Sequence, residues 1–88
     1  MEKYNLSFKK SVTKDLRAIP KQDLKRIIER FDDLSKNPRP VGCEKLSGQE
    51  RYRIRQGDYR IIYEIRDDVL VVVVVKVGHR REVYRDNS

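Results

Sequence analysis

The sequence has few of the residues on which disulfide and metal chemistry depend. Its only cysteine is Cys43 and its only histidine is His79. A single cysteine excludes an internal disulfide and a cysteine-based zinc site, and a single histidine excludes a metal site built mainly from histidines. Adjacent acidic residues occur only at 32–33, in a predicted helix, and at 67–68, in a predicted turn, where we expect solvent to surround them. The sequence therefore predicts no metal ion and no cofactor.

Glycine-rich phosphate loops, a serine–histidine–aspartate order and long apolar runs are absent as well. No apolar stretch of 18 residues is present to span a membrane. Met1–Lys10 lacks the apolar centre of a signal peptide. We therefore expect a cytoplasmic protein that has no membrane partner.

The length leaves room for a single domain, which we place at residues 1–88. Hydrophobic residues make up only 38% of the chain and charged residues 40%. A domain of this size buries only about 60–65% of its unfolded surface, so that its core is thin. We expect any functional site to be a shallow surface and not an enclosed cavity.

Basic residues outnumber acidic ones by 21 to 14, which gives a net charge of +7. This excess favours a polyanionic partner, either a nucleic acid or an acidic protein. The basic residues up to Gly48 are mostly lysines, whereas those after it are nearly all arginines. Arginine binds phosphate through a planar fork of N–H donors, although it also suits the exposed surface of a strand.

Apolar periodicity predicts a strand and two helices in the first part of the chain. Residues 3–8 alternate apolar and polar side chains, as a short strand does. From Lys9 the period becomes helical, and Pro20 ends this first helix and begins a second, which runs to about Ser35. The predicted buried stripe of the second helix consists of Leu24, Ile27, Ile28, Phe31 and Leu34. The two helices should form a hairpin, and residues 37–48, which contain prolines and glycines, should form a loop.

Three strands are predicted to follow in quick succession. Residues 51–56 and 59–66 alternate in the manner of strands, and short turns follow each of them. Residues 69–77 are apolar on both faces, which is typical of a central strand, and Gly78 should end this strand before a short basic segment, residues 79–86. The predicted fold is α+β, in the order β-α-α-β-β-β with a C-terminal tail. The helical hairpin should pack on one face of a mostly antiparallel four-stranded sheet.

The strand alternation predicts one strongly basic face. Tyr52 and Ile54 should point to the helices, so that the arginines around them point to the opposite, open side. The same reasoning places Arg60 of the next strand there. We call this set the arginine face, and it consists of Arg51, Arg53, Arg55 and Arg60. Only Glu64 and Glu50 are acidic residues placed to balance it, so this face is either a phosphate-binding platform or a solvated strand surface.

Four residues beyond the last predicted strand extend this candidate site. Arg80 and Arg81 add two cations, and Tyr84 is suited to stack on a base of single-stranded RNA, unless its ring packs on the sheet edge. His79 is the only side chain near the site whose ordinary pKa, about 6.5, lies close to working pH. It is therefore predicted to accept a proton in catalysis, with a contact to backbone or to RNA phosphate as the alternative.

The stretch RYRIRQGDYRIIYEI, followed by a valine-rich strand and VGHRREVYRD, resembles the RelE/ParE superfamily of bacterial and archaeal toxins. The resemblance extends over nearly the whole chain, including the LSG before this stretch and the two-helix start. It implies a RelE-like toxin of a type II toxin-antitoxin system, which cleaves mRNA in the ribosomal A site and so inhibits translation. In that family the 2′-oxygen attacks the adjacent phosphate without a metal, giving a 2′,3′-cyclic phosphate and a 5′-hydroxyl. The implied partners are a cognate antitoxin, the ribosome and mRNA.

The resemblance also implies roles for single residues. Arg53 and Arg55 match the paired basic positions of the first strand after the helices, and Arg60 matches the arginine that follows the aromatic residue in the next strand. Arg80 matches the arginine after the glycine, and Tyr84 the stacking tyrosine. Family members with two lysines at the paired positions can use one as a base, whereas arginine keeps its proton and only stabilises charge. The predicted catalytic residues are Arg55, Arg60, His79, Arg80 and Tyr84, and the predicted RNA-binding residues are Arg51, Arg53 and Arg81.

Two other functions are compatible with this resemblance. ParE-like members of the superfamily poison DNA gyrase and cleave nothing, and an inactive member would only bind its antitoxin. The presence of His79, Arg80 and Tyr84 near Arg60 favours the nuclease, because poisoning gyrase needs no phosphate site.

Overall fold

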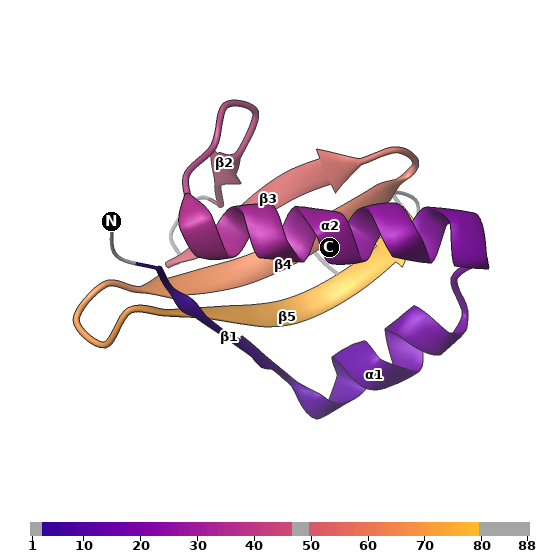
Figure 1. The fold of residues 1–88 in the computed structure, drawn as a ribbon, viewed down its shortest axis with the longest axis horizontal. Coiled ribbons are helices and arrows are strands. Elements are labelled where there is room, and N and C mark those ends of the chain that lie inside the picture. The colour runs from indigo at the N-terminus through magenta and orange to yellow at the C-terminus, as the bar shows by residue number, and fades with distance from the viewer. Residues whose placement is uncertain (1–2, 47–49, 80–88) are drawn as a thin grey trace.

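The computed structural model describes residues 3–46 and 50–79. The helices and strands of these ranges are, in chain order, β1 (Asn5–Phe8), α1 (Lys10–Arg17), α2 (Lys21–Lys36), β2 (Glu44–Lys45), β3 (Arg51–Gln56), β4 (Tyr59–Arg66) and β5 (Val71–His79) (Figure 1). Neither helix of the described part is long and apolar enough to cross a membrane.

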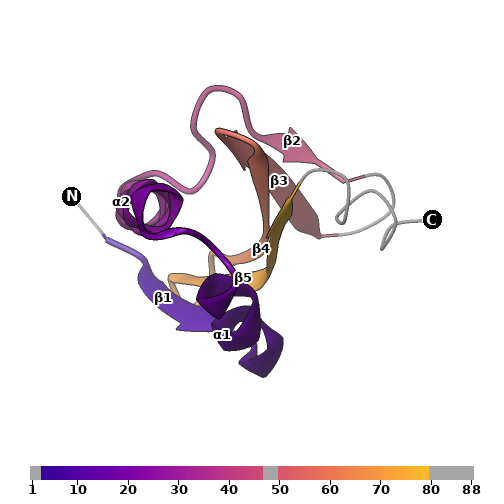
Figure 2. The same ribbon diagram turned by 90° about the vertical axis from the view of Figure 1, so that its right-hand side faces the viewer.

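The strands form one sheet in the order β1-β5-β4-β3-β2. β1 runs parallel to β5, and all other neighbours are antiparallel. Both helices lie on the same side of this sheet (Figure 2). The predicted α+β fold, with two helices between the first strand and a mostly antiparallel meander, is confirmed.

The predicted number of four strands is wrong, because β2 adds a fifth strand to the sheet of the described residues. Glu44 and Lys45 lie in the segment that was predicted to be a loop, but they pair with β3. Beside them the Leu46 N–H donates to the Arg51 carbonyl oxygen over 2.8 Å. A strand of two residues is too short for apolar alternation to reveal it.

The last strand starts and ends two residues later than predicted. Residues 67–70 form the turn between β4 and β5, with Leu70 at a φ of 53°. Val69, which was predicted to begin the strand, is therefore exposed in this turn. Gly78 lies inside β5 and pairs with Arg60, so it does not end the strand.

A bulge between β4 and β5 decides which valines are buried. β5 has one extra residue, Val75, between the partners of Ile62 and Tyr63. Such an extra residue turns the side chains that follow it to the other side of the sheet. The valines of β5 that are buried in the core are Val72, Val74 and Val77.

The core lies between the helices and the sheet. Val12 of α1 and Ile27 of α2 are fully buried. The other buried members of the cluster are Ile19, Phe31, Leu34, Ile54, Ile61, Tyr63, Val72, Val74 and Val77. The predicted stripe of α2 is thus confirmed for Ile27, Phe31 and Leu34, but Ile28 is 53% exposed. Ile28 lies about 100° around the helix from Ile27, at the margin of the stripe.

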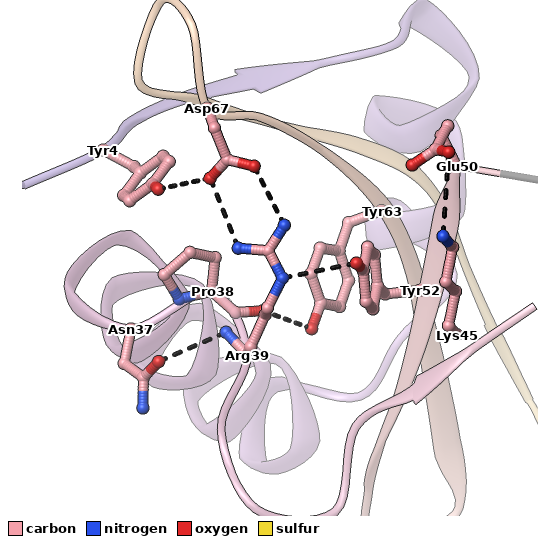
Figure 3. A network of polar contacts seen from close by, with 9 residues as sticks. All are labelled: Tyr4, Asn37, Pro38, Arg39, Lys45, Glu50, Tyr52, Tyr63 and Asp67. Atoms are coloured by element: carbon pink, nitrogen blue, oxygen red, sulfur yellow. Dashed lines mark hydrogen bonds and ion pairs between the residues drawn. The ribbon is translucent and has the colours of Figure 1, made fainter.

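Arg39, in the connection between α2 and β2, ties distant parts of the fold together (Figure 3). Its guanidinium donates hydrogen bonds of 2.9 and 3.3 Å to the Asp67 carboxylate and one of 3.3 Å to the Tyr52 hydroxyl. The Tyr4 hydroxyl donates to the same carboxylate over 2.6 Å. The Arg39 guanidinium and the Asp67 carboxylate therefore join three parts of the chain, namely the segment before β1, the strand β3 and the β4–β5 turn.

Asp67→Asn should make the fold less stable at neutral pH and less sensitive to acid. Hydrogen bonds from Arg39 and Tyr4 lower the pKa of the Asp67 carboxyl to about 2. A carboxyl whose pKa is lower in the folded than in the unfolded state stabilises the fold above the unfolded value, and this contribution is lost as the pH falls from about 4 towards 2. Thermal unfolding measured between neutral and acid pH tests this. A variant that melts at the parent's temperature throughout that range would contradict it.

Candidate nucleic-acid interface

The register of β3 and β4 places the predicted arginines on one side of the sheet. Arg51 lies opposite Glu64, and Arg55 lies opposite Arg60. Side chains of directly opposed residues share a face, so the four arginines of the arginine face lie on one side of the sheet. The intervening residues of these strands carry the apolar side chains Ile54, Ile61 and Tyr63, which are buried.

Acidic residues balance one end of the arginine face. The Arg51 Nε donates to a Glu64 carboxylate oxygen over 3.1 Å, and Arg66 donates to the other oxygen over 3.1 Å. Burial raises the pKa of Glu64, but the hydrogen bonds from these two arginines outweigh it, and the pKa lies below its ordinary value. Glu64 was expected from the sequence to balance this face, whereas Glu50 pairs instead with Lys45 at 3.6 Å.

A second acidic residue on this face was missed by the sequence analysis. Glu44 lies directly opposite Arg53, and its carboxylate accepts a hydrogen bond of 2.7 Å from the Arg53 Nη2. The hydrogen bond and charge of Arg53 lower the pKa of Glu44, and the charges of Arg60 and Arg55 lower it further. Glu44 could be found only by recognising β2, because a loop residue has no predictable face.

Arg55 and Arg60 face each other where β3 and β4 approach their connecting turn. Arg55 is exposed and has no ion pair with any other residue in 3–46 and 50–79. Arg60 was predicted on an open surface, but it is only 4% exposed. Two guanidiniums on directly opposed residues repel each other, and burial strengthens that repulsion. This end of the face is therefore a candidate site for an anion such as a phosphate.

Lys76 of β5 extends the basic surface and was not singled out from the sequence. Lys76 lies opposite Ile62, which in turn lies opposite Arg53. These three side chains therefore form a row across β5, β4 and β3 on one face of the sheet. The sequence could have indicated this residue, because Lys76 is the only charged residue in the valine-rich strand.

His79 lies away from the arginine face. It is opposite Tyr59, and the centroids of the two rings are 5.8 Å apart in an edge-on arrangement. Tyr59 precedes Arg60 on β4, and successive residues of a strand point to opposite faces. His79 therefore belongs to the side that carries the helices, where it lines a pocket of about 630 Å³ with Lys14 and Asp15 of α1. Its role in proton transfer stays a prediction.

Three residues of the predicted site, Arg80, Arg81 and Tyr84, lie outside the described residues. Their roles as catalytic or RNA-binding groups stay predictions. Within the described residues no three acidic, histidine or cysteine side chains are grouped closely enough to hold a metal ion.

A second surface of interest lies between the two helices. We call it the helix groove; it is a pocket of about 340 Å³ lined by Phe8, Val12, Thr13, Leu16, Arg17, Leu24 and Ile28. Phe8 and Ile28 are 44% and 53% exposed. An adjoining hollow is lined by Leu24 and Ile28 together with Lys21, Lys25 and Glu29. Grouped exposed apolar side chains of this kind mark interaction surfaces.

Comparisons with known proteins place the chain in a family. A family profile described as "ParE toxin of type II toxin-antitoxin system, parDE" matches residues 6–84. Toxin RelG of Mycobacterium tuberculosis is 35% identical over 86 residues, which cover 93% of this chain and 97% of that protein. The mRNA interferase toxin RelE of Escherichia coli is 27% identical over 88 residues, which cover 94% of this chain and 92% of that protein.

Solved structures agree with this assignment. The archaeal RelE–RelB complex from Pyrococcus horikoshii matches with a TM-score of 0.80 at 33% identity, over 89% of this chain and 96% of the matched chain. The intact RelBE toxin-antitoxin complex of Escherichia coli matches with a TM-score of 0.75 at 28% identity, over 86% of this chain and 95% of the matched chain. The chain belongs to the RelE/ParE superfamily of toxins of type II toxin-antitoxin systems. The relatives compared here carry the names RelE and RelG, and the resemblance inferred from the sequence is confirmed.

Arg55→Ala should weaken the binding of a single-stranded RNA oligonucleotide more than Arg51→Ala does. Arg51 is already held by Glu64, whereas Arg55 has no acidic partner among the described residues. Loss of one phosphate contact should reduce the slope of log affinity against log salt by about 0.7. Fluorescence anisotropy at several salt concentrations measures that slope, and thermal unfolding checks the fold of both variants. Equal slopes for Arg55→Ala and the parent would contradict a phosphate contact at Arg55.

Proposed function

We propose that this toxin is a ribosome-dependent endoribonuclease that cuts mRNA and thereby inhibits translation. The observation that carries the proposal is the pair Arg55 and Arg60, one exposed and one buried, on directly opposed positions of a shallow basic surface. The relative from Escherichia coli that is named an mRNA interferase supports the substrate class. Access to ribosomes requires that the toxin act in the cytoplasm.

The proposed reaction is the attack of an RNA 2′-oxygen on the adjacent phosphorus. The products are a 2′,3′-cyclic phosphate and a 5′-hydroxyl, and the reaction needs no metal. Negative charge grows on the non-bridging phosphate oxygens in the transition state, and preorganised cations stabilise it. Arg55 and Arg60 supply the positive charge for this stabilisation, and Arg53 and Arg51 extend the basic surface along the RNA backbone. Burial restricts the conformations open to the Arg60 guanidinium.

Dependence on the ribosome follows from the shape of this surface. The arginine face is part of a sheet and does not enclose a substrate, so it aligns a flexible RNA poorly without help. Alignment of the reacting atoms contributes several kcal/mol in enzymes, about 7–11 kcal/mol at most. The ribosome presents mRNA in a fixed path and can supply this alignment, and Arg80, Arg81 and Tyr84 are predicted to add RNA contacts.

The toxin should cut a transcript only while that transcript is translated. Primer extension on a translated and an untranslated copy of one mRNA measures this. The Arg60→Gln variant provides the control, since loss of one transition-state donor costs on the order of 3 kcal/mol. Its melting temperature must be measured as well, because Arg60 is buried and its replacement changes the packing around it.

Equal cutting of both transcripts would contradict ribosome dependence. DNA breaks with intact mRNA would instead show that the toxin acts on DNA gyrase, as the ParE-like alternative requires. A parent protein that affects neither mRNA nor DNA, yet binds its antitoxin, would be the inactive member of the superfamily.

We further propose that the cognate antitoxin lays an amphipathic helix in the helix groove. Two of the matched solved structures are complexes of a RelE toxin with RelB. The groove of this chain is lined mainly by apolar side chains, and the groove and its adjoining hollow also carry three cations, Arg17, Lys21 and Lys25, against one carboxylate, Glu29. A helix with one apolar face and acidic flanks complements this pattern. A second copy of this chain would bring the same cations against each other.

Ile28→Glu should therefore weaken antitoxin binding at least tenfold, because it places a charged carboxylate among the apolar side chains of the groove. Val41→Glu is the matched control, since Val41 is an exposed apolar residue, as Ile28 is, but does not line the groove. Isothermal titration calorimetry at low and high salt measures both variants. If Ile28→Glu binds like the parent, and affinity falls steeply with salt, the antitoxin covers the arginine face and not the helix groove.

A further inference from the structure

We propose that Glu44 is the proton acceptor of the arginine face, which takes the proton of the attacking 2′-hydroxyl. This inference rests on the proposed endoribonuclease function and supplies the group that the arginines cannot provide. Arginine remains protonated in proteins at any working pH and so cannot act as a base.

The placement of Glu44 follows from the short strand β2. Glu44 pairs directly with Arg53, so that both side chains lie on the arginine face. The Arg53 Nη2 holds the carboxylate at 2.7 Å, and the Glu44 side chain is 67% exposed while that of Arg53 is 21% exposed. The carboxylate is therefore oriented by a partly buried arginine and remains open to a ligand. A base oriented by a third group is the arrangement that nucleophile activation requires.

The charges around Glu44 connect it with the proposed phosphate site. Arg53 lowers its pKa, and Arg60 and Arg55 act on it in the same direction. Glu44 is therefore ionised in the free toxin and within electrostatic range of the two arginines that we assign to the phosphate. A bound phosphate would oppose these arginines with negative charge and raise the pKa of Glu44. The carboxylate would thus become a better base when the substrate is in place.

Other described groups are less well placed for this step. Glu64 is held by both Arg51 and Arg66 and is only 18% exposed. His79 lies on the side of the sheet that carries the helices, next to Tyr59. Glu44 is the carboxylate that shares a face with Arg53, Arg55 and Arg60 and is also open to solvent.

The proposed step balances as follows. The Glu44 carboxylate takes the proton of the 2′-hydroxyl while the 2′-oxygen forms a bond to phosphorus. The bond from phosphorus to the 5′-oxygen breaks, and that oxygen takes a proton from water to become the 5′-hydroxyl. The resulting hydroxide takes the proton from Glu44, so that the carboxylate is restored.

Single-turnover cleavage of mRNA on ribosomes tests the proposal with the Glu44→Gln variant. Glutamine keeps a hydrogen-bond acceptor for Arg53 but is not a base, and we expect the rate to fall on the order of a hundredfold. Glu64→Gln is the matched control, since it also weakens an ion pair of the arginine face but should leave the rate within a few-fold of the parent. Binding of a 2′-O-methyl RNA, which cannot be cleaved, should be unchanged or tighter for Glu44→Gln, because a negative charge is removed.

The combination of a slower reaction and undiminished binding distinguishes a base from a structural residue, which would lower both. A Glu44→Gln rate within a few-fold of the parent would overturn the proposal while the ribonuclease assignment stands. The proposal would also be overturned if the cleavage rate of the parent falls as the pH drops below about 6.5 and the His79→Gln variant lacks this pH dependence. His79 would then be the base. A parent that cuts no mRNA would overturn both the base and the proposed function, and melting temperatures confirm that each variant is folded.

Discussion

The antiparallel register of β3 and β4 is the constraint on which the rest of this structure depends. Pairing of Ile54 with Ile61 and of Tyr52 with Tyr63 gives the sheet its apolar side. A slip of one residue would turn these side chains to solvent and bring the arginines into the core. The burial of the apolar set therefore holds the arginine face in place, so the pairing that stabilises the sheet also positions these arginines.

The same register distributes charge unevenly over that face. Glu64 balances Arg51 and Arg66 near one end, and Glu44 balances Arg53 in the middle. Arg55 and Arg60 meet at the other end. Directly opposed cations repel each other and do not add to the stability that the core provides. The proposed function gives these two arginines a role, the binding of an anionic substrate.

Much of this architecture could be predicted from alternation and helical periodicity, because long elements repeat their pattern many times. The features that could not be predicted depend on contacts between distant residues. β2 has only two residues, so no local pattern predicts it. The side of the sheet on which Glu44 lies is known only from the pairing of β2 with β3. The bulge at Val75 and the extension of β5 past Gly78 depend on pairing with β4. The burial of Arg60 likewise has no local signal in the sequence, and the position of His79 follows from its pairing with Tyr59.

In the proposed reaction, the arginine face promotes attack by an RNA 2′-oxygen on the neighbouring phosphorus. The most direct measurement uses an mRNA with one 2′-deoxynucleotide on the 5′ side of the bond that is cut, presented to the toxin on the ribosome. The account predicts that cutting stops at this bond only, and that the fragments from unmodified mRNA carry a 2′,3′-cyclic phosphate and a 5′-hydroxyl. Undiminished cutting at the deoxy position, or fragments with a 3′-hydroxyl and a 5′-phosphate, would contradict it.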